Sequence, residues 1–231
     1  MALEPAIPVE ELDALRRLDT CTVSDAIETF QLRLRNAGFA DARVRCMFED
    51  FPPLVGYAAT ARLRTGEPPI TGFHHDRHDW WNSILQVPAP RIAVLEDLDE
   101  PPGVGAVLGH MHAAILSALG CVGYVTNGAV RELPPLRDLG FHLFAGNVAV
   151  SHAYAHVFDF GSTIHVGKLE VRPGDLLHGD RHGLLKVPKD MASEIPGVAA
   201  NLQQAEQRVI DFCRSQEFSV DKLRREVKGL S

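Results

Sequence analysis

The sequence predicts a single α/β domain with helices at both ends. Apolar segments of strand length alternate with segments of helical periodicity, and residues 91–126 follow the strand, helix, strand order of a βαβ unit. The composition, 45% hydrophobic and 23% charged over 231 residues, is that of a globular chain with a substantial core. No Ser- or Gly-rich linker divides residues 1–231, so we expect one domain.

Two amphipathic helices are predicted at the start of the chain. Residues 9–19 place Leu12, Leu15 and Leu18 on one helical face. Several N-cap candidates within residues 20–25 precede a second helix. Both helices are expected to pack against the rest of the domain.

The sequence predicts the strands of a sheet in the middle of the chain and a helical region at its end. Strands are expected at residues 55–63, 91–97, 122–126, 143–150, 164–171 and 175–187. A helix at 110–119, closed by Gly120, separates the second and third of these strands. The composition becomes helical after Ser193, which predicts a C-terminal helical region over residues 191–231.

Charge and cysteine usage exclude several classes of partner. The formal net charge is −7 and the basic residues are scattered, so nucleic acid is not expected as a partner. The N-terminus lacks a signal sequence, and no apolar run reaches the roughly 18 residues of a membrane span, which predicts a cytoplasmic protein without membrane contact. The four cysteines form no C-x-x-C pair, which argues against a zinc knuckle or a redox motif.

Two turns carry the residues best suited to chemistry. Gly109 precedes the helix at 110–119, so the free N–H groups of that helix, including those of His110 and Met111, can bind an anion. Arg131 and Glu132 follow the strand at 122–126, beyond the carboxyl end where open α/β sheets bind their ligands. Each signal alone is weak, since glycines and surface ion pairs are common in turns.

Together the two turns predict one site. If the helix packs back on the sheet, its N-terminus and the turn after the next strand lie at the same edge. Arg131 could then bind a small carboxylate bidentately, and Glu132 could hold a Mg²⁺ ion that keeps most of its waters. Gly109, His110, Met111 and Arg131 are therefore candidate substrate-binding residues, and Glu132 is the candidate metal ligand.

Histidines offer further candidates with competing interpretations. His110 and His112 are about 200° apart on an ideal helix, so they cannot share a metal unless His110 still belongs to the turn. The segment from His74 to Trp81 contains three histidines, His74, His75 and His78, which are possible metal ligands. No acid or cysteine stands at a spacing that would complete a known metal motif, so a mobile loop or lid is the preferred interpretation of this segment.

Several motifs, spread over about residues 20–190, resemble the RraA-like family. They are Thr22-Val23-Ser24-Asp25-Ala26, Gly56 to Thr60, the Gly109 turn, Asn127-Gly128-Ala129-Val130-Arg131, Leu139-Gly140-Phe141, and Pro173-Gly174-Asp175 through Asp180, Gly183 and Pro188. This family includes 4-hydroxy-4-methyl-2-oxoglutarate aldolases, the regulator of ribonuclease E activity, and members labelled as demethylmenaquinone methyltransferases. The last activity is not expected here, because the chain has no glycine-rich nucleotide loop followed by an acidic strand end.

The resemblance implies a swivelling β/β/α domain with flanking N- and C-terminal helices, assembled as a homotrimer or a hexamer with the site at a subunit interface. Its catalytic members are class II pyruvate aldolases that also decarboxylate oxaloacetate. Arg131 matches the arginine with which they bind the 2-oxo acid. The resemblance also implies an acid supplied by a neighbour's C-terminal region, for which Glu217 is the candidate, and a structural role for Asp180.

Two positions depart from the family pattern. Glu132 stands where Asp is usual, which moves the carboxylate by about 1.5 Å. His110 replaces the acid that orders metal-bound water. The resulting hypothesis is a class II lyase for pyruvyl-type 2-oxo acids that depends on a divalent metal, Mg²⁺ or alternatively Mn²⁺, with Glu217 or His110 as base. The alternatives are a protein-binding regulator without catalysis, and a divergent enzyme for another substrate.

Overall fold

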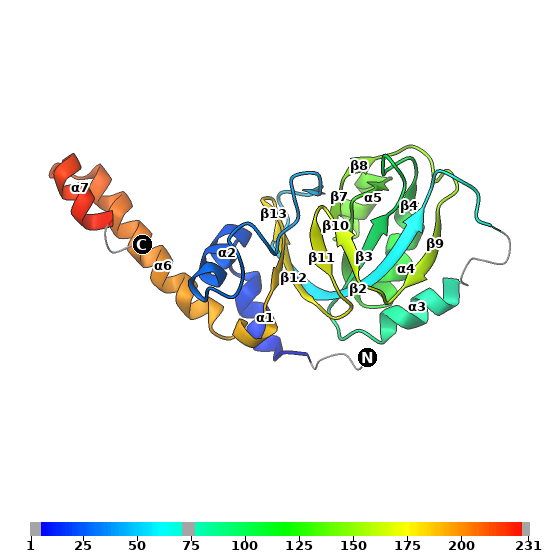
Figure 1. Ribbon diagram of the computed structural model, residues 1–231, viewed down its shortest axis with the longest axis horizontal. Coiled ribbons are helices and arrows are strands. Elements are labelled where there is room, and N and C mark those ends of the chain that lie inside the picture. The colour runs from blue at the N-terminus through cyan, green and yellow to red at the C-terminus, as the bar shows by residue number, and fades with distance from the viewer. Residues whose placement is uncertain (1–5, 71–76, 228–231) are drawn as a thin grey trace.

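The computed structural model describes residues 6–70 and 77–227 as a mixed α/β fold with helices at both ends (Figure 1). The helices are α1 (Val9–Arg16), α2 (Thr20–Thr29), α3 (Arg77–Leu85), α4 (His110–Ala118), α5 (Leu133–Asp138), α6 (Ile195–Arg214) and α7 (Val220–Glu226), with a short 3-10 helix at Lys189–Met191. The strands are β1 (Arg45–Cys46), β2 (Leu54–Arg64), β3 (Arg91–Asp97), β4 (Ala106–Leu108), β5 (Cys121–Thr126), β6 (Ala129–Val130), β7 (His142–Ala145), β8 (Asn147–Val148), β9 (His156–Phe160), β10 (Ile164–Val166), β11 (Leu169–Val171), β12 (Leu176–Asp180) and β13 (Gly183–Val187).

The main sheet is built around the long strand β2. Its strand order is β1-β7-β5-β3-β2-β12-β13, and β9 also pairs with β2. The first half of β2 pairs with β12 and the second half with β9, both antiparallel. The sheet therefore curls on itself towards a barrel, while β2, β3, β5 and β7 run parallel at its centre.

Alternating side chains of the central strands fill a core on each face of the sheet. On β3, Ala93 and Leu95 join the larger core with the helices. Ile92 and Val94 point to the other face, where the β10–β11 hairpin covers them. All four residues are buried, which explains why β3 is apolar without a polar face.

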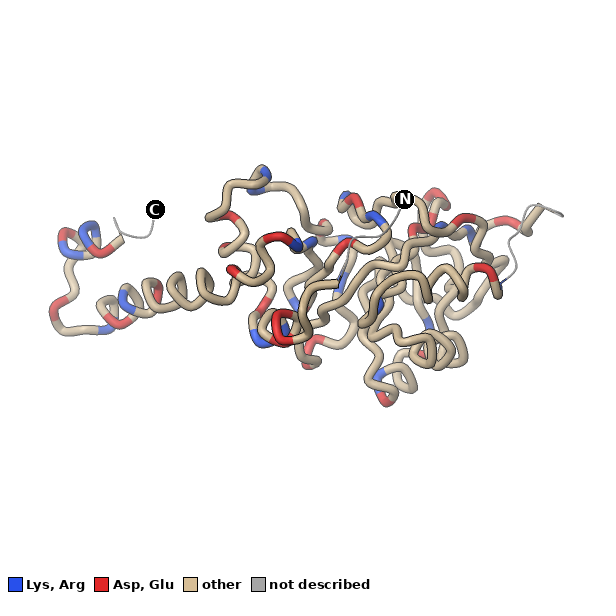
Figure 2. The backbone as a smooth tube through the Cα atoms, turned by 90° about the horizontal axis from the view of Figure 1, so that it is seen from below, with Lys and Arg blue, Asp and Glu red and all other residues tan. Residues whose placement is uncertain are grey.

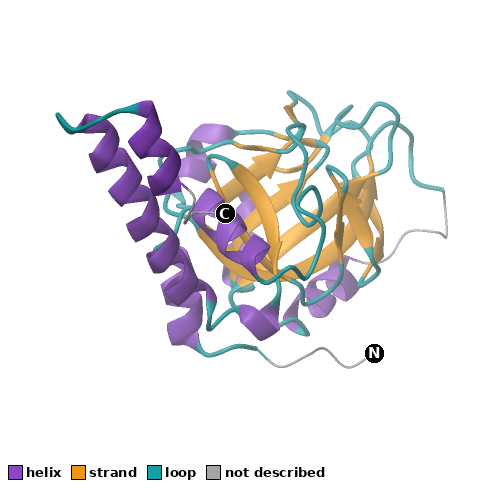
Figure 3. Ribbon diagram, turned by 60° about the vertical axis from the view of Figure 1, so that its left-hand side comes forward, coloured by secondary structure: helices purple, strands orange, loops and turns teal. Residues whose placement is uncertain are grey.

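The terminal helices are attached beside the β12–β13 hairpin. The fully buried His178 of β12 shares hydrogen bonds with the Thr20 hydroxyl and the Leu15 carbonyl oxygen, each at 3.1 Å. Helix α6 buries Ile195 and Ala199 near its start and then runs away from the sheet towards α7 (Figures 1 and 3). None of the helices in ranges 6–70 and 77–227 has the length and hydropathy to cross a lipid bilayer.

Charged residues of both signs are interspersed along the described backbone (Figure 2). This distribution agrees with the scatter of basic residues that the sequence shows.

The βαβ prediction is confirmed, because β3 and β5 are parallel neighbours on either side of α4. The single strands predicted at 164–171 and 175–187 are instead hairpins. The strand predicted at 143–150 is divided at Gly146, where a Cβ atom would collide with the carbonyl oxygen of Asn127. Its two parts, β7 and β8, belong to different sheets.

The interpretation of the segment from His74 to Trp81 as a loop is wrong for its second part. Helix α3 begins at Arg77, and burial of Trp80 and Ile84 stabilises it against the sheet. The first part of the segment, with His74 and His75, lies outside the described residues.

Candidate functional site

A small parallel sheet brings the two candidate turns together. Strands β4, β6 and β8 are neighbours in this sheet. Gly109 follows β4 and Arg131 follows β6, and the backbone N–H of Arg131 donates to the Leu108 carbonyl oxygen at 3.2 Å. Because the two strands are parallel, both turns leave the sheet at the same edge.

Glu132 closes the N-terminus of α4 with its side chain. Its Oε2 atom accepts a hydrogen bond from the backbone N–H of His110 at 2.7 Å. The N-cap residue Gly109 has no side chain for this bond, and a Cβ atom at position 109 would lie 2.6 Å from Oε2 of Glu132. Because Gly109 has no Cβ atom, there is room for the Glu132 carboxylate beside it.

The surroundings of Glu132 favour its ionised form. The hydrogen bond from His110 lowers the pKa of the Glu132 carboxyl group, and the positive charges of Arg131, His152 and His110 act in the same direction. Glu132 itself has a left-handed backbone conformation, with φ of 58°. An anionic group is therefore fixed at the positive end of the α4 dipole.

Arg131 keeps donors available beside this carboxylate. One terminal guanidinium nitrogen lies 3.5 Å from Oε1 of Glu132. The Nε atom is buried and has no hydrogen-bond partner within the described part of the chain. A buried cationic donor without an acceptor is costly, so this arrangement favours an added anion next to Arg131.

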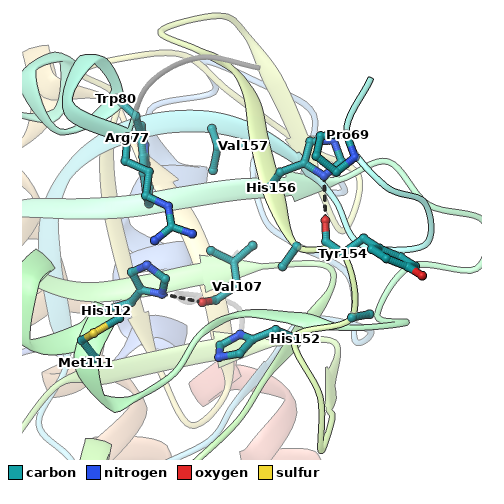
Figure 4. A pocket seen from close by; sticks show the side chains of 12 residues that line it. Pro69, Arg77, Trp80, Val107, Met111, His112, His152, Tyr154, His156 and Val157 are labelled. Atoms are coloured by element: carbon teal, nitrogen blue, oxygen red, sulfur yellow. Dashed lines mark hydrogen bonds between the residues drawn. The ribbon is translucent and has the colours of Figure 1, made fainter. Parts of the chain in front are cut away.

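A cleft of about 910 Å³ borders the first turn of α4. Met111 and His112 of α4 lie at one side, and Arg77 and Trp80 of α3 lie at another (Figure 4). His152 also lines the cleft, and in its protonated form it lowers the pKa of the Glu132 carboxyl group. The cleft therefore includes side chains from the first turn of α4 and from the start of α3.

Two imidazole rings at this cleft are each held by a backbone carbonyl oxygen. Nδ1 of His112 lies 2.9 Å from the Val107 carbonyl oxygen (Figure 4). Nδ1 of His152 lies 2.6 Å from the Ala106 carbonyl oxygen. Each Nδ1–H donates to its carbonyl group, so each neutral ring keeps its lone pair on Nε2. Burial, together with the charges of Arg77 and His152, lowers the pKa of His112.

The remaining predicted residues are placed differently. The His110 side chain is exposed, and 65% of Met111 is exposed at the rim of the cleft. Glu217 lies between α6 and α7 with its side chain 80% exposed, 3.4 Å from Lys222, and the chain does not bring it to the Gly109 turn (Figure 1). His78 lies on α3, where its ring contacts Trp81.

His152 and Arg77 line the cleft without having been predicted from the sequence. His152 follows β8, a strand of two residues without detectable periodicity, and no motif surrounds it. Arg77 begins a helix in a segment interpreted as a loop. Asp180 has the structural role that was expected, because it accepts hydrogen bonds from the backbone N–H groups of Thr20 and His182.

The fold and the paired turns define a class of α/β protein with a near-barrel sheet, flanking helices and a candidate anion site at the ends of parallel strands. The chain belongs to the RraA-like family, described as Aldolase/RraA, whose family model matches residues 20–185.

Similar proteins agree with this assignment. A protein of Halalkalibacterium halodurans, provisionally named as a 4-hydroxy-4-methyl-2-oxoglutarate aldolase, is 27% identical over 107 residues, which are 46% of this chain and 48% of that protein. Two further curated relatives, of Legionella pneumophila and Methanocaldococcus jannaschii, are matched over 25% and 65% of their lengths. The chain thus spans less than two thirds of the curated relatives that it matches.

Solved structures share the fold. A protein of Pseudomonas syringae pv. tomato has a TM-score of 0.72 at 22% identity, with 96% of this chain and 95% of that chain covered. RraAS2 of Streptomyces coelicolor, described as an unusual member of the RNase ES inhibitor RraA family, has a TM-score of 0.68 at 20% identity, covering 87% and 97%. Both similarities concern the fold alone.

Proposed function

We propose that this chain is a carbon–carbon lyase that acts on a pyruvyl-type 2-oxo acid. The observation that carries the proposal is the buried Nε of Arg131, which has no hydrogen-bond partner among the described residues and belongs to a side chain beside Gly109, the N-cap residue of α4. Membership of the family described as Aldolase/RraA, and a relative provisionally named as an aldolase, support this reaction class.

The substrate carboxylate would bind to Arg131. Its guanidinium group can donate two parallel hydrogen bonds to a carboxylate. When the bond between C3 and C4 breaks, negative charge develops on the pyruvyl fragment, and the same guanidinium group stabilises it. The rest of the substrate would extend into the cleft, past Met111 and His152.

The Glu132 carboxylate is a suitable ligand for a hydrated divalent cation. The lowered pKa of Glu132 favours its carboxylate form, its side chain is 41% exposed, and Oε1 lies 3.5 Å from a guanidinium nitrogen of Arg131. One carboxylate with waters and substrate oxygens is a ligand set that Mg²⁺ accepts, and Mn²⁺ is the alternative. When bound, the metal supplies Lewis-acid polarisation of the 2-oxo group.

The aldol reaction also requires a base for the substrate hydroxyl group. His110 and Glu217 are the candidates from the sequence, with Glu217 contributed by a neighbouring subunit of a trimer or hexamer. His152 is a third candidate, because its Nε2 lone pair is available at the cleft. A neutral imidazole can accept this proton through its free ring nitrogen.

The test is pyruvate release from oxaloacetate and from 4-hydroxy-4-methyl-2-oxoglutarate, in Mg²⁺, Mn²⁺ or EDTA. Metal without protein is the control, since free metal ions decarboxylate oxaloacetate. We expect turnover that requires metal and is lost in Glu132→Gln, which keeps the size of the side chain and an acceptor for the His110 N–H group. Turnover in EDTA, or undiminished turnover in Glu132→Gln, would contradict the assigned role of Glu132.

One observation favours a second function, a protein-binding regulator without catalysis. The Glu132 carboxylate already occupies the His110 N–H group, which a substrate carboxylate would otherwise use. Absence of turnover with every metal, combined with specific retention of an endoribonuclease in pull-down experiments, would favour this alternative.

A further inference from the structure

The start of α2 and the turn between β12 and β13 meet at a buried carboxylate. Asp180 is 8% exposed, and its Oδ2 atom accepts the Thr20 N–H group at 2.9 Å. Its Oδ1 atom accepts the His182 N–H group at 2.8 Å. Two segments about 160 residues apart in sequence are thus held in fixed positions by one side chain.

Three potential metal ligands surround this junction. One ligand atom each of Asp19, Cys21 and His182 lies within 4.8 Å of the other two. Ligand atoms around a tetrahedral Zn²⁺ ion are separated by about 3.3–3.8 Å, given bonds of about 2.0–2.3 Å. Cys21 and His182 are exposed, so rotation of their side chains can bring the ligand atoms to these shorter separations.

Hydrogen bonds with neighbouring groups hold two of these ligands in position. Nδ1 of His182 lies 3.0 Å from Oδ1 of Asp180, and donation of that N–H leaves the lone pair on Nε2. A carboxylate that holds a histidine by its other nitrogen is the usual support of a zinc-bound imidazole. Asp19 is held too, since its two oxygens accept the backbone N–H and the hydroxyl group of Thr22.

We propose that Asp19, Cys21 and His182 form a Zn²⁺ site with water as the fourth ligand. The mixture of thiolate, imidazole and carboxylate suits Zn²⁺ and not Mg²⁺, which prefers oxygen ligands. The site lies at the end of the molecule that carries α2 and α6, whereas α4 and the Glu132 carboxylate lie at the other end (Figure 1). Zinc bound here would tie α2 to the edge of the main sheet.

The experiment uses the full chain, stripped of metal with EDTA and titrated with Zn²⁺ by calorimetry and with Co²⁺ by absorption spectroscopy. Co²⁺ gives a thiolate charge-transfer band only where a cysteine is a ligand. We expect one equivalent with this band in the native chain, in Cys213→Ala, which removes another exposed thiol, and in Glu132→Gln. Cys21→Ala and His182→Ala should lose it, and their exposed positions should leave folding intact.

A thermal readout accompanies the titration. At a hundredfold excess over its dissociation constant, Zn²⁺ should raise the melting temperature of the native chain by about 5–11 °C. Cys21→Ala and His182→Ala should show no such rise. The proposal is overturned if no equivalent binds, or if binding and the rise in melting temperature persist in both variants.

Discussion

Arg131 provides the sharpest test of the candidate site, because its donors can be removed stepwise. Arg131→Lys keeps the positive charge but loses the planar fork and the Nε donor. Arg131→Met keeps an unbranched stem of similar length and loses all donors. Nε has no partner among the described residues, so neither change removes a protein hydrogen bond from that atom. We therefore expect melting temperatures close to that of the native chain.

The effect on activity follows from the number of hydrogen bonds lost. A hydrogen bond to a charged group contributes about 1.5–3 kcal/mol, and about 1.4 kcal/mol corresponds to a factor of ten. Loss of one of two bonds should lower kcat/KM by about 10–150-fold in Arg131→Lys. Loss of both should lower it by roughly 10²–10⁴-fold in Arg131→Met.

The assay is coupled detection of pyruvate from oxaloacetate, at saturating Mg²⁺ and corrected for the metal-only rate. Equal activity of Arg131→Lys and the native chain would show that only a point charge is needed. Undiminished activity of Arg131→Met would refute the placement of the substrate carboxylate on Arg131. A large fall in melting temperature would show that the side chain is structural.

Three further predictions concern other parts of the molecule. Gly109→Ala should lower turnover, measured with the same assay, because the new Cβ would lie 2.6 Å from Oε2 of Glu132 and displace this carboxylate; unchanged turnover would show that its position is not needed. Burial lowers the pKa of His142 to about 4, so the unfolded chain binds this proton at higher pH, and stability falls as the pH drops from about 6.5 towards 4. His142→Phe should flatten this part of the melting-temperature profile, and an unchanged slope would exclude His142 as its source. If a neighbour supplies Glu217, mixed oligomers of inactive Glu217→Gln and Arg131→Met subunits should recover part of the activity, whereas no recovery on subunit exchange would argue against a shared site.

The order of the central elements was predictable from the sequence, because long apolar strands and an amphipathic helix have clear periodicities. Strand β3 was predicted with its observed bounds, and α4 to within one residue. The sheet of β4, β6 and β8 was not predicted, since strands of two or three residues are too short to show a period. Helix α3 was missed because tertiary packing of Trp80 and Ile84 outweighs a composition typical of a loop.

The candidate site was only partly accessible to sequence reasoning. The meeting of the Gly109 and Arg131 turns follows from parallel strand ends, and the structure brings them together. The hydrogen bond from His110 to Glu132 could not be predicted, because it depends on the left-handed backbone of Glu132 and on the missing Cβ of Gly109. The orientations of His112 and His152 depend on carbonyl groups of β4, which no side-chain pattern reveals.

The hydrogen bond between Glu132 and the His110 N–H group makes this carboxylate an internal competitor for ligands. A 2-oxo acid that takes the same N–H group must displace it, so binding there is an exchange of one carboxylate for another. The binding free energy measured for such a ligand is then the difference between two similar hydrogen bonds, one from the N–H group to the ligand and one from it to Glu132. The measured value is therefore smaller than the contribution of either bond. Weak binding of substrate fragments to the native chain would therefore be compatible with a well-formed site, and in the absence of metal Glu132→Ala should bind the same fragments more tightly.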